Sequence, residues 1–368
     1  MIRLIVVSLI LSISLFVQAA DDLKKPIVLG SSSALSGPAK QLGMRLNAGA
    51  NLYFEHINKN GGVNGHRIEL TLLDDAYEPT KALKNTYQLL DNKSLFAFFN
   101  FVGTPTSSAV LPEVIRNNIP YITPFTGAQF LREQSTKEVV NLRASYYQEA
   151  QEQIDYLVEE VGAKKIGLLV QADEFGVSLE KGYLKALDKI GRKPTITTRY
   201  RRNTTDIALA LEILMRHEVD AVAFVGTYEP FAALINEGYR KGFSPYYTAV
   251  SFVSSQDLFP LLPYPSKVLI TEVVPDIASC EQSVCLEFRE LAKKANVIDY
   301  GPIEFEGFLN AKLFSALAHL CVDNFNRSCI TQKIASKNFD LGGIKASYNN
   351  ENFQGMNNVY RSFNFDFQ

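Results

Sequence analysis

The chain has 368 residues, of which 46% are hydrophobic and 21% charged, and its formal net charge is −2. This length exceeds one ordinary hydrophobic core, so we expect two domains or lobes. The near-neutral charge gives no reason to expect nucleic acid as a partner.

The first residues have the three parts of a secretory signal peptide. Arg3 supplies a positive charge, residues 4–17 form an apolar run, and Val17-Gln18-Ala19 is a small-residue cleavage site. The run is shorter than the roughly 20 apolar residues of a membrane span. We therefore expect residues 1–19 to be a signal peptide that is removed, rather than an uncleaved anchor. The mature chain would be periplasmic and soluble, and losing Arg3 would change its charge from −2 to −3.

Strand and helix patterns alternate along the rest of the chain. Apolar runs predict strands, and apolar residues three to four positions apart predict helices. The first block contains expected strands at 27–30, 68–72, 95–101 and 121–123, and expected helices at about 42–57, 79–92 and 107–117. The second block, after Arg143, contains expected helices at 147–161, 178–190, 205–217 and 230–241, and expected strands at 165–170, 194–198 and 221–225. Helices at about 284–295 and 305–325 and a Gly- and Asn-rich tail of short strands follow. Two such blocks predict an α/β fold of two doubly wound, Rossmann-like lobes.

Three loops of the first block come directly after predicted strands. They are residues 34–38 (Ala-Leu-Ser-Gly-Pro), 103–106 (Gly-Thr-Pro-Thr) and 123–128 (Thr-Pro-Phe-Thr-Gly-Ala). Ligands of open α/β sheets bind at the carboxyl ends of the strands. Small hydroxyl residues at helix starts offer oxygens and free N–H groups to a polar ligand. The loops therefore predict a site for something small and polar.

Four cysteines form two local pairs by spacing, Cys280 with Cys285 and Cys321 with Cys329. In an oxidising compartment both pairs can close as disulfides, which is the reading we favour. Free or buried thiols are the alternative. A metal site is disfavoured because neither pair has C-x-x-C spacing.

Sequence motifs for catalysis and cofactor binding are missing. The chain lacks G-x-G-x-x-G, a Walker loop and G-x-S-x-G, and His217-Glu218 has Ala221 where a zinc-protease motif needs a second His. Asp74-Asp75 could serve as an acid–base pair, but its place at a strand end favours structural capping. We therefore predict no enzyme activity, no cofactor and no metal.

Several segments together resemble periplasmic solute-binding proteins of the leucine/isoleucine/valine type, the capture subunits of ABC importers. The resemblance rests on the segments 34–38, 48–62, 74–75, 119–124, 142–143 and 173–176 in this order and spacing, and it weakens after Phe325. It implies a type 1 periplasmic binding fold, in which two lobes close on a ligand like a flytrap. Three crossings between the lobes are then expected near Arg143, Val273 and Ile330. The N-terminal lobe would comprise residues 20–143 plus 274–330, and the C-terminal lobe residues 144–273 plus 331–368.

The resemblance also implies ligand-binding residues. Thr104 matches the hydroxyl that holds a ligand carboxylate, Phe125 a position contributing backbone groups, and Thr126 or Gly127 the next hydroxyl position. Further residues expected to line the cleft are Leu42, Tyr146, Phe175, Tyr228 and Ser251. Each has an alternative reading as a turn cap or core residue.

Three positions depart from the family pattern. Leu42 stands where branched-chain binders tend to have Tyr, Gly127 replaces a Thr, and Ser251 stands near the expected acidic partner of the ligand ammonium. A buried ammonium without a carboxylate is costly, so these departures disfavour a free α-amino acid unless Asp173, Glu174 or Glu229 substitutes.

The sequence thus predicts a monomeric periplasmic receptor that captures an amino acid, or a related amide or organic acid, for a membrane permease. The alternative is a sensor or interaction protein of the same fold that regulates a membrane kinase or an envelope enzyme.

Overall fold

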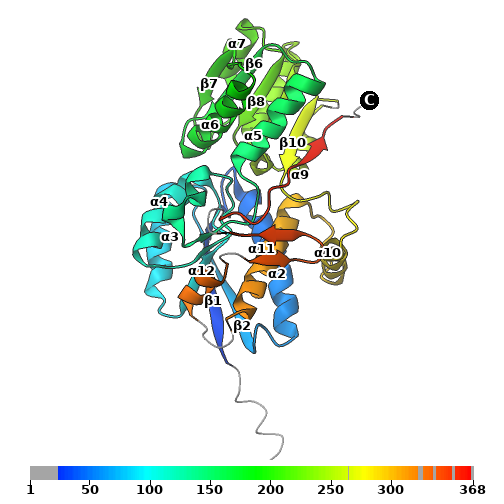
Figure 1. Cartoon of the computed structure of the whole chain (residues 1–368). Coiled ribbons are helices and arrows are strands. Elements are labelled where there is room, and N and C mark those ends of the chain that lie inside the picture. The colour runs from blue at the N-terminus through cyan, green and yellow to red at the C-terminus, as the bar shows by residue number, and fades with distance from the viewer. Residues whose placement is uncertain (1–23, 264, 322–325, 335–336, 350–352, 366–368) are drawn as a thin grey trace, which may run out of the picture.

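A computed structural model describes residues 24–263, 265–321, 326–334, 337–349 and 353–365. The predicted signal peptide lies outside these residues. Figure 1 shows two α/β lobes, one above the other, with the chain passing between them more than once. The predicted fold class of two doubly wound lobes is confirmed. In the described part of the chain, no helix combines the length and apolar character needed to traverse a bilayer.

The first lobe is built on a parallel five-stranded sheet with the order β2-β1-β3-β4-β5. The strands are β1 (Lys24–Ser33), β2 (His66–Asp74), β3 (Leu95–Phe99), β4 (Tyr121–Ile122) and β5 (Val139–Val140). Successive residues of β3 point to opposite faces, so that Phe99 packs with α2 (Lys40–Lys59), α10 (Ser283–Lys294) and α11 (Pro302–His319). Phe98 packs instead with α3 (Pro79–Asp91) and α4 (Thr104–Arg116) on the other face. Helix α12 is Arg327–Ile334.

The second lobe has a six-stranded sheet with the order β13-β10-β9-β8-β6-β7. Its strands are β6 (Ile166–Gln171), β7 (Ile196–Tyr200), β8 (Ala221–Val225), β9 (Tyr246–Ala249), β10 (Val268–Glu272) and β13 (Tyr360–Phe363), of which only β13 pairs antiparallel. Helices α5 (Tyr146–Asp155) and α6 (Glu174–Lys189) cover one face, and α7 (Ala208–Arg216), α8 (Tyr228–Arg240) and α9 (Ser255–Leu258) the other. Helix α5 continues as a π-helical turn, η3 (Tyr156–Glu160). Short 3₁₀ turns are η1 (Gln129–Arg132), η2 (Gln134–Thr136), η4 (Ser251–Val253) and η5 (Phe259–Leu261).

The tail returns to both lobes, but later than expected. The antiparallel pair β11 (Asn338–Asp340) and β12 (Lys345–Ser347) packs into the core of the first lobe through Phe339 and Ala346. The backbone of Met356 still bonds to Leu142, and only then does β13 join the second sheet. The third crossing is therefore at residues 357–359 and not near Ile330. The prediction that the described strands between Asn338 and Ser347 belong to the C-terminal lobe was wrong, because short strands do not reveal which sheet or core they join.

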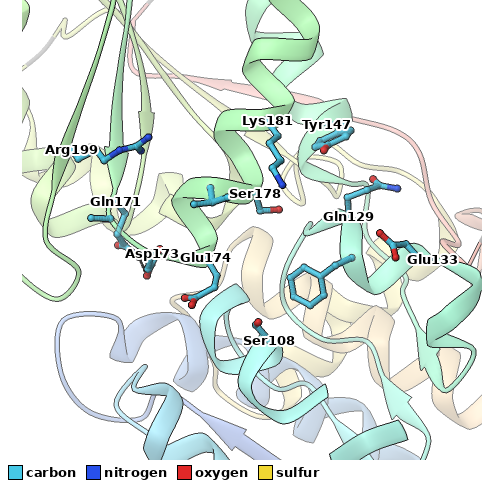
Figure 2. A pocket seen from close by; sticks show the side chains of 13 residues that line it. Ser108, Gln129, Glu133, Tyr147, Gln171, Asp173, Glu174, Ser178, Lys181 and Arg199 are labelled. Atoms are coloured by element: carbon cyan, nitrogen blue, oxygen red, sulfur yellow. Dashed lines mark hydrogen bonds between the residues drawn. The ribbon is translucent and has the colours of Figure 1, made fainter. Parts of the chain in front are cut away.

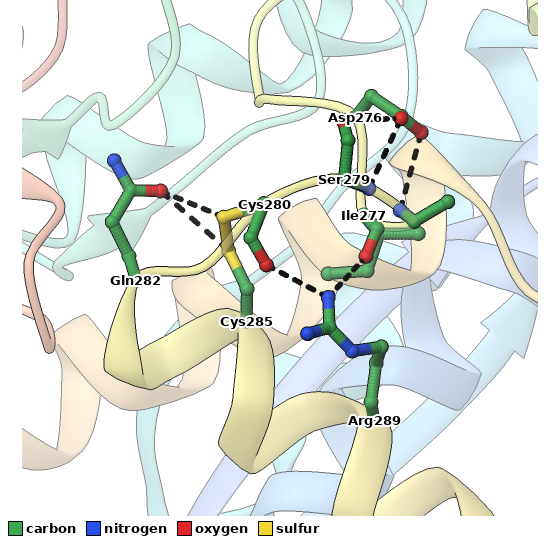
Figure 3. Close-up of a disulfide and its surroundings, with 8 residues drawn as sticks. Asp276, Ile277, Ser279, Cys280, Gln282, Cys285 and Arg289 are labelled. Atoms are coloured by element: carbon green, nitrogen blue, oxygen red, sulfur yellow. Dashed lines mark hydrogen bonds between the residues drawn. A yellow bond between two sulfur atoms is a disulfide. The ribbon is translucent and has the colours of Figure 1, made fainter.

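Both predicted disulfides are present. Cys280 is bonded to Cys285 and Cys321 to Cys329, so no cysteine is left as a thiol. Figure 3 shows the first of them beside α10, where the Arg289 guanidinium donates to the carbonyls of Ile277 and Cys280 at 2.6 and 2.8 Å. These bonds fix the loop that re-enters the first lobe after β10.

Candidate functional site

The strand-end loops of the first lobe bring two hydroxyl groups together. Gly103, with φ of 106°, turns the chain from β3 into α4, so that Thr104 is the first residue of this helix. Thr126 follows β4, and its Oγ1 lies 2.6 Å from Oγ1 of Thr104. Both side chains are fully buried and lie at the carboxyl edge of the sheet, where the sequence predicts a ligand.

Asp74, the last residue of β2, and the adjacent Asp75 hold this edge in place. The Asp74 carboxylate accepts hydrogen bonds from the backbone of Leu35 and Ser36 and from the Ser36 hydroxyl. Partial burial opposes its ionisation, but these bonds outweigh it and lower its pKa. Burial raises the pKa of Asp75, which accepts from Ser32 at 2.7 Å, to about 6. The pair caps loops, as the favoured sequence interpretation predicts.

In the second lobe, two helix starts place aromatic rings at the opposite edge. Asp173 caps α6 by accepting from the N–H groups of Phe175 and Gly176 at 3.0 and 3.2 Å. Ser145 and Gln148 form a capping box at α5, which makes Tyr146 its first residue. The Tyr146 N–H also donates to the Gly127 carbonyl at 2.8 Å, so the two lobes touch through their backbones here.

Phe252 lies at the centre of the lobe interface. Its ring centroid is 5.7 Å from that of Tyr77 and 5.5 Å from that of Phe125, both in the first lobe. It is 5.0 Å from the ring of Phe175, which in turn is 5.2 Å from Tyr146. All five rings are fully buried. We call these five residues the aromatic interface; they fill the space between the facing strand ends.

Two of the departures noted in the sequence have a packing explanation. A Cβ on Gly127 would lie 2.4 Å from Cδ1 of Tyr146, so the close approach of the lobes requires glycine at this position. Leu42, on α2, is fully buried in the hydrophobic cluster that contains the aromatic interface. Gly127 is therefore accounted for by contact between the lobes, and Leu42 by packing in this cluster.

Ser251, the third departure, contacts a buried ion pair. Its N–H and hydroxyl donate to the Glu149 carboxylate at 2.8 and 3.1 Å, and its Oγ accepts from Arg143. The Arg143 guanidinium lies 4.4 Å from the ring centroid of Phe125, a cation–π contact. An acidic side chain, Glu149, is therefore present next to Ser251, although it comes from another part of the sequence.

Tyr228 lies apart from the other predicted site residues. It starts α8 and packs in the cluster on the other face of the second sheet. Burial raises its pKa to about 12, and Glu229 and Asp257 act in the same direction.

Two interlobe ion pairs flank the aromatic interface. Arg45 of α2 pairs with Asp257 of the second lobe at 2.9 Å. Arg202 of the second lobe pairs with Glu78 of the first at 2.6 Å. We call these the two latches. Because each joins residues from different lobes, both must break when the lobes separate.

A groove of about 690 Å³ opens beside the aromatic interface (Figure 2). The first lobe contributes Ser108, Gln129, Phe130 and Glu133; the second contributes Tyr147 and residues of β6, α6 and β7, including Glu174, Lys181 and Arg199. Figure 2 shows Lys181 extending from α6 toward the groove above Gln129. Polar groups of both lobes and both signs of charge therefore line one continuous opening.

Sequence reasoning missed Phe252, Tyr77 and the pairing of Arg143 with Glu149. Phe252 directly follows the predicted site residue Ser251, and this adjacency could have indicated that Phe252 also lies at the site. The pairing has no such clue, because its members are brought together only by the tertiary fold.

Two facing α/β lobes, joined by three crossings and lined by strand-end loops, define a class of proteins that bind ligands between lobes. The sequence profile of the periplasmic binding protein family matches residues 26–360, and the chain belongs to this family, in its leucine/isoleucine/valine-binding type.

Curated relatives and solved structures agree with this assignment. The chain is 24% identical over 212 residues to "Leu/Ile/Val-binding protein BraC3" of Rhizobium johnstonii, an alignment that covers 57% of this chain and 56% of the relative. It is 25% identical over 235 residues to "Amino acid binding protein" of Pseudomonas aeruginosa, covering 63% and 62%. The matches thus span less than two thirds of these relatives. The crystal structure of a possible leucine/isoleucine/valine-binding protein from Rhodopirellula baltica superposes with a TM-score of 0.87 at 28% identity, covering 93% of this chain and 95% of that one.

Proposed function

We propose that this protein is the periplasmic solute receptor of an ABC importer and captures one small polar ligand between its lobes by hinge closure. The observation that carries the proposal is the lobe interface. Facing strand ends meet there, three crossings connect the lobes, and the two latches span the gap.

The latches and the aromatic interface would act together in closure. In the structure the side chains of the two lobes contact each other directly, and Phe252 lies between Phe125 of the first lobe and Phe175 of the second. A ligand that contacts both lobes lowers the free energy of one arrangement relative to the other, which is what a receptor needs for signalling occupancy.

The ligand would bind at the edge where the hydroxyl pair, the aromatic interface and the groove adjoin. Thr104 and Thr126 offer hydroxyls. Gln129, Glu174 and Lys181 line the adjoining groove and add groups for an amino acid, amide or organic acid. The relatives are named for leucine, isoleucine and valine, but the packing of Leu42 and Gly127 leaves the choice among these classes to experiment.

The remaining parts of the proposal extend the sequence predictions. The protein would be exported by its N-terminal segment, act as a monomer and deliver the ligand to a membrane permease without catalysing a reaction. Among the residues that the structure describes, no group of metal-ligating side chains converges. The fold and the names of the relatives support a binding role.

The proposal is tested by a thermal-shift screen of the mature chain with L-amino acids, their amides and small carboxylic acids. A bound ligand raises the melting temperature by mass action. Small-angle scattering with the same compounds then reports whether the arrangement of the lobes changes. Failure of every compound to alter either the melting temperature or the scattering profile would count against a solute receptor.

The variant Thr104→Ala tests whether the Thr104 hydroxyl contacts the ligand. Loss of a hydroxyl that contacts the ligand costs about 1 kcal/mol or more, so affinity for the strongest compound of the screen should fall at least about fivefold by calorimetry. Thr86→Ala is the matched control. Thr86 is also fully buried in the first lobe, but its hydroxyl donates within α3 to Ala82 at 2.8 Å. Equal affinities of the two variants would remove Thr104 from the site.

A further inference from the structure

Four ionisable side chains are buried together where the lobes are joined. Arg143 lies in the first crossing and Glu149 on α5, while Glu272 ends β10 just before the second crossing and Glu306 lies on α11 of the first lobe. Their exposed fractions are 1%, 0%, 3% and 3%. We call them the hinge cluster. Two crossings and both lobes contribute to it, so its geometry depends on how the lobes are arranged.

The hinge cluster contains three carboxyl groups but only one guanidinium group. Arg143 Nε lies 3.5 Å from Glu306 Oε1, and Arg143 Nη2 lies 4.0 Å from Glu149 Oε1. Among the described residues, Arg143 is the one cation within 4.0 Å of these carboxylates. Arg143 therefore contacts two of the three carboxyl groups, and Glu272, which is equally buried, has no cation within 4.0 Å among the described residues.

A second guanidinium lies nearby but is engaged elsewhere. Arg132 donates to the Ala128 carbonyl at 2.8 Å, to the Arg143 carbonyl at 3.2 Å and to the Gln354 side chain at 2.6 Å. Its charge reaches the carboxylates only at longer range. Burial lowers the pKa of Arg132 to about 9, and the charge of Arg143 acts in the same direction.

Hydrogen bonds distinguish the three carboxyl groups. Glu149 accepts from the backbone and hydroxyl of Ser251 and from the Thr271 hydroxyl at 2.9 Å, so it is the best prepared to be ionised. Glu272 accepts from the Ser255 hydroxyl at 2.6 Å. Glu306 faces Arg143 at ion-pair distance. An ionised carboxylate in such a buried place is costly unless it is fully compensated.

The excess of carboxyl groups favours retention of a proton in the closed form. Burial raises the pKa of Glu272 to about 8; Glu149 and Glu306 add to the rise, and Ser255 and Arg143 oppose it. Burial raises the pKa of Glu306 to about 7, against the effect of Arg143. Separation of the lobes would admit water to the cluster, and both groups would then regain pKa values nearer to those of exposed glutamates.

We propose that closure of the lobes is coupled to proton uptake by the hinge cluster, with Glu272 as the main proton acceptor. The inference rests on the proposed hinge closure. The closed form binds the additional proton, so closure is favoured as the pH falls below about 8 and weakens as the pH rises toward it. For one linked proton, the equilibrium constant for closure changes by up to about tenfold per pH unit between the two pKa values.

The decisive experiment is small-angle scattering of the ligand-free mature chain from pH 6 to pH 9. The wild-type radius of gyration should rise with pH as the open form becomes populated. Glu272→Gln keeps an acceptor for Ser255 but cannot ionise, so this variant should remain compact throughout. Glu113→Gln is the control, because Glu113 is also buried but pairs with Arg116 inside the first lobe. A wild-type radius that does not change with pH, or equal pH dependence in wild type and Glu272→Gln, would overturn the proposal.

Calorimetry with the strongest compound of the thermal-shift screen provides a second measurement. Binding near pH 7 in phosphate and in Tris, whose heats of ionisation differ, gives the number of protons taken up. We expect net uptake in the wild type and at least a twofold smaller uptake in Glu272→Gln. Binding without proton uptake would refute the coupling and leave the receptor function intact, whereas a screen without any binding compound would count against the receptor function itself.

Discussion

Replacing Phe252 by alanine tests whether the aromatic interface holds the lobes together. The wild-type ring faces two rings of the first lobe, those of Tyr77 and Phe125, at 5.7 and 5.5 Å. Aromatic pairs contribute about 0.5–1.5 kcal/mol each beyond their buried area, so losing two interlobe pairs costs roughly 1–3 kcal/mol of closure free energy. The ratio of closed to open molecules should then fall by about 5- to 150-fold.

Small-angle scattering of Phe252→Ala should accordingly show a larger radius of gyration than the wild type at the same pH. Phe98→Ala is a matched control. Phe98 is equally buried, but it packs with Phe101 and Tyr121 inside the first lobe. This control should lower the melting temperature, since removing a buried Phe costs about 3–5 kcal/mol, without changing the arrangement of the lobes. If the two variants have the same radius as the wild type, Phe252 is an ordinary core residue and our reasoning is wrong.

Two further predictions concern a latch and a disulfide. Asp257→Asn removes one latch charge while Arg45 keeps Glu304 at 2.6 Å, so closure should weaken by about 1 kcal/mol, and the effect should shrink in high salt. Unchanged scattering at low salt would show that this ion pair is not a latch. Replacing Cys321 and Cys329 together by serine should lower the free energy of unfolding by roughly 2–3 kcal/mol in urea, because the short loop is no longer closed in the unfolded chain. Equal unfolding midpoints for the variant and the oxidised wild type would contradict this.

Most elements of both lobes could be predicted from the sequence, although the strands Val139–Val140, Tyr246–Ala249 and Val268–Glu272 were missed. Buried strands such as Ala221–Val225 are continuous apolar runs, and helices such as Lys40–Lys59 repeat apolar residues every three to four positions. The strand-end hydroxyls of Thr104 and Thr126 do meet at the edge of the sheet, and their contact with a ligand stays a prediction. These features depend on local periodicity, which a single sequence contains.

Features that depend on distant residues could not be predicted. Nothing near Arg143 in the sequence shows that it is buried, because its contacts Ser251 and Glu306 are more than 100 positions away. Phe252 looks like a core residue of one lobe, and only the docking of the lobes places its ring against Phe125. The lobe assignment of the tail was wrong for the same reason, because a short strand such as Asn338–Asp340 carries no local mark of the core against which it packs.

The late return of the tail gives residues 357–363 a mechanical role, because they form the third crossing and strand β13. Strand β13 pairs with β10, while the backbone of residues 353–356 bonds to Asn141 and Leu142 of the first lobe. Two crossings alone would let the lobes twist against each other, and the third crossing would restrict this twisting. A protease cut at residues 357–359 should thus leave both halves folded and free them to twist.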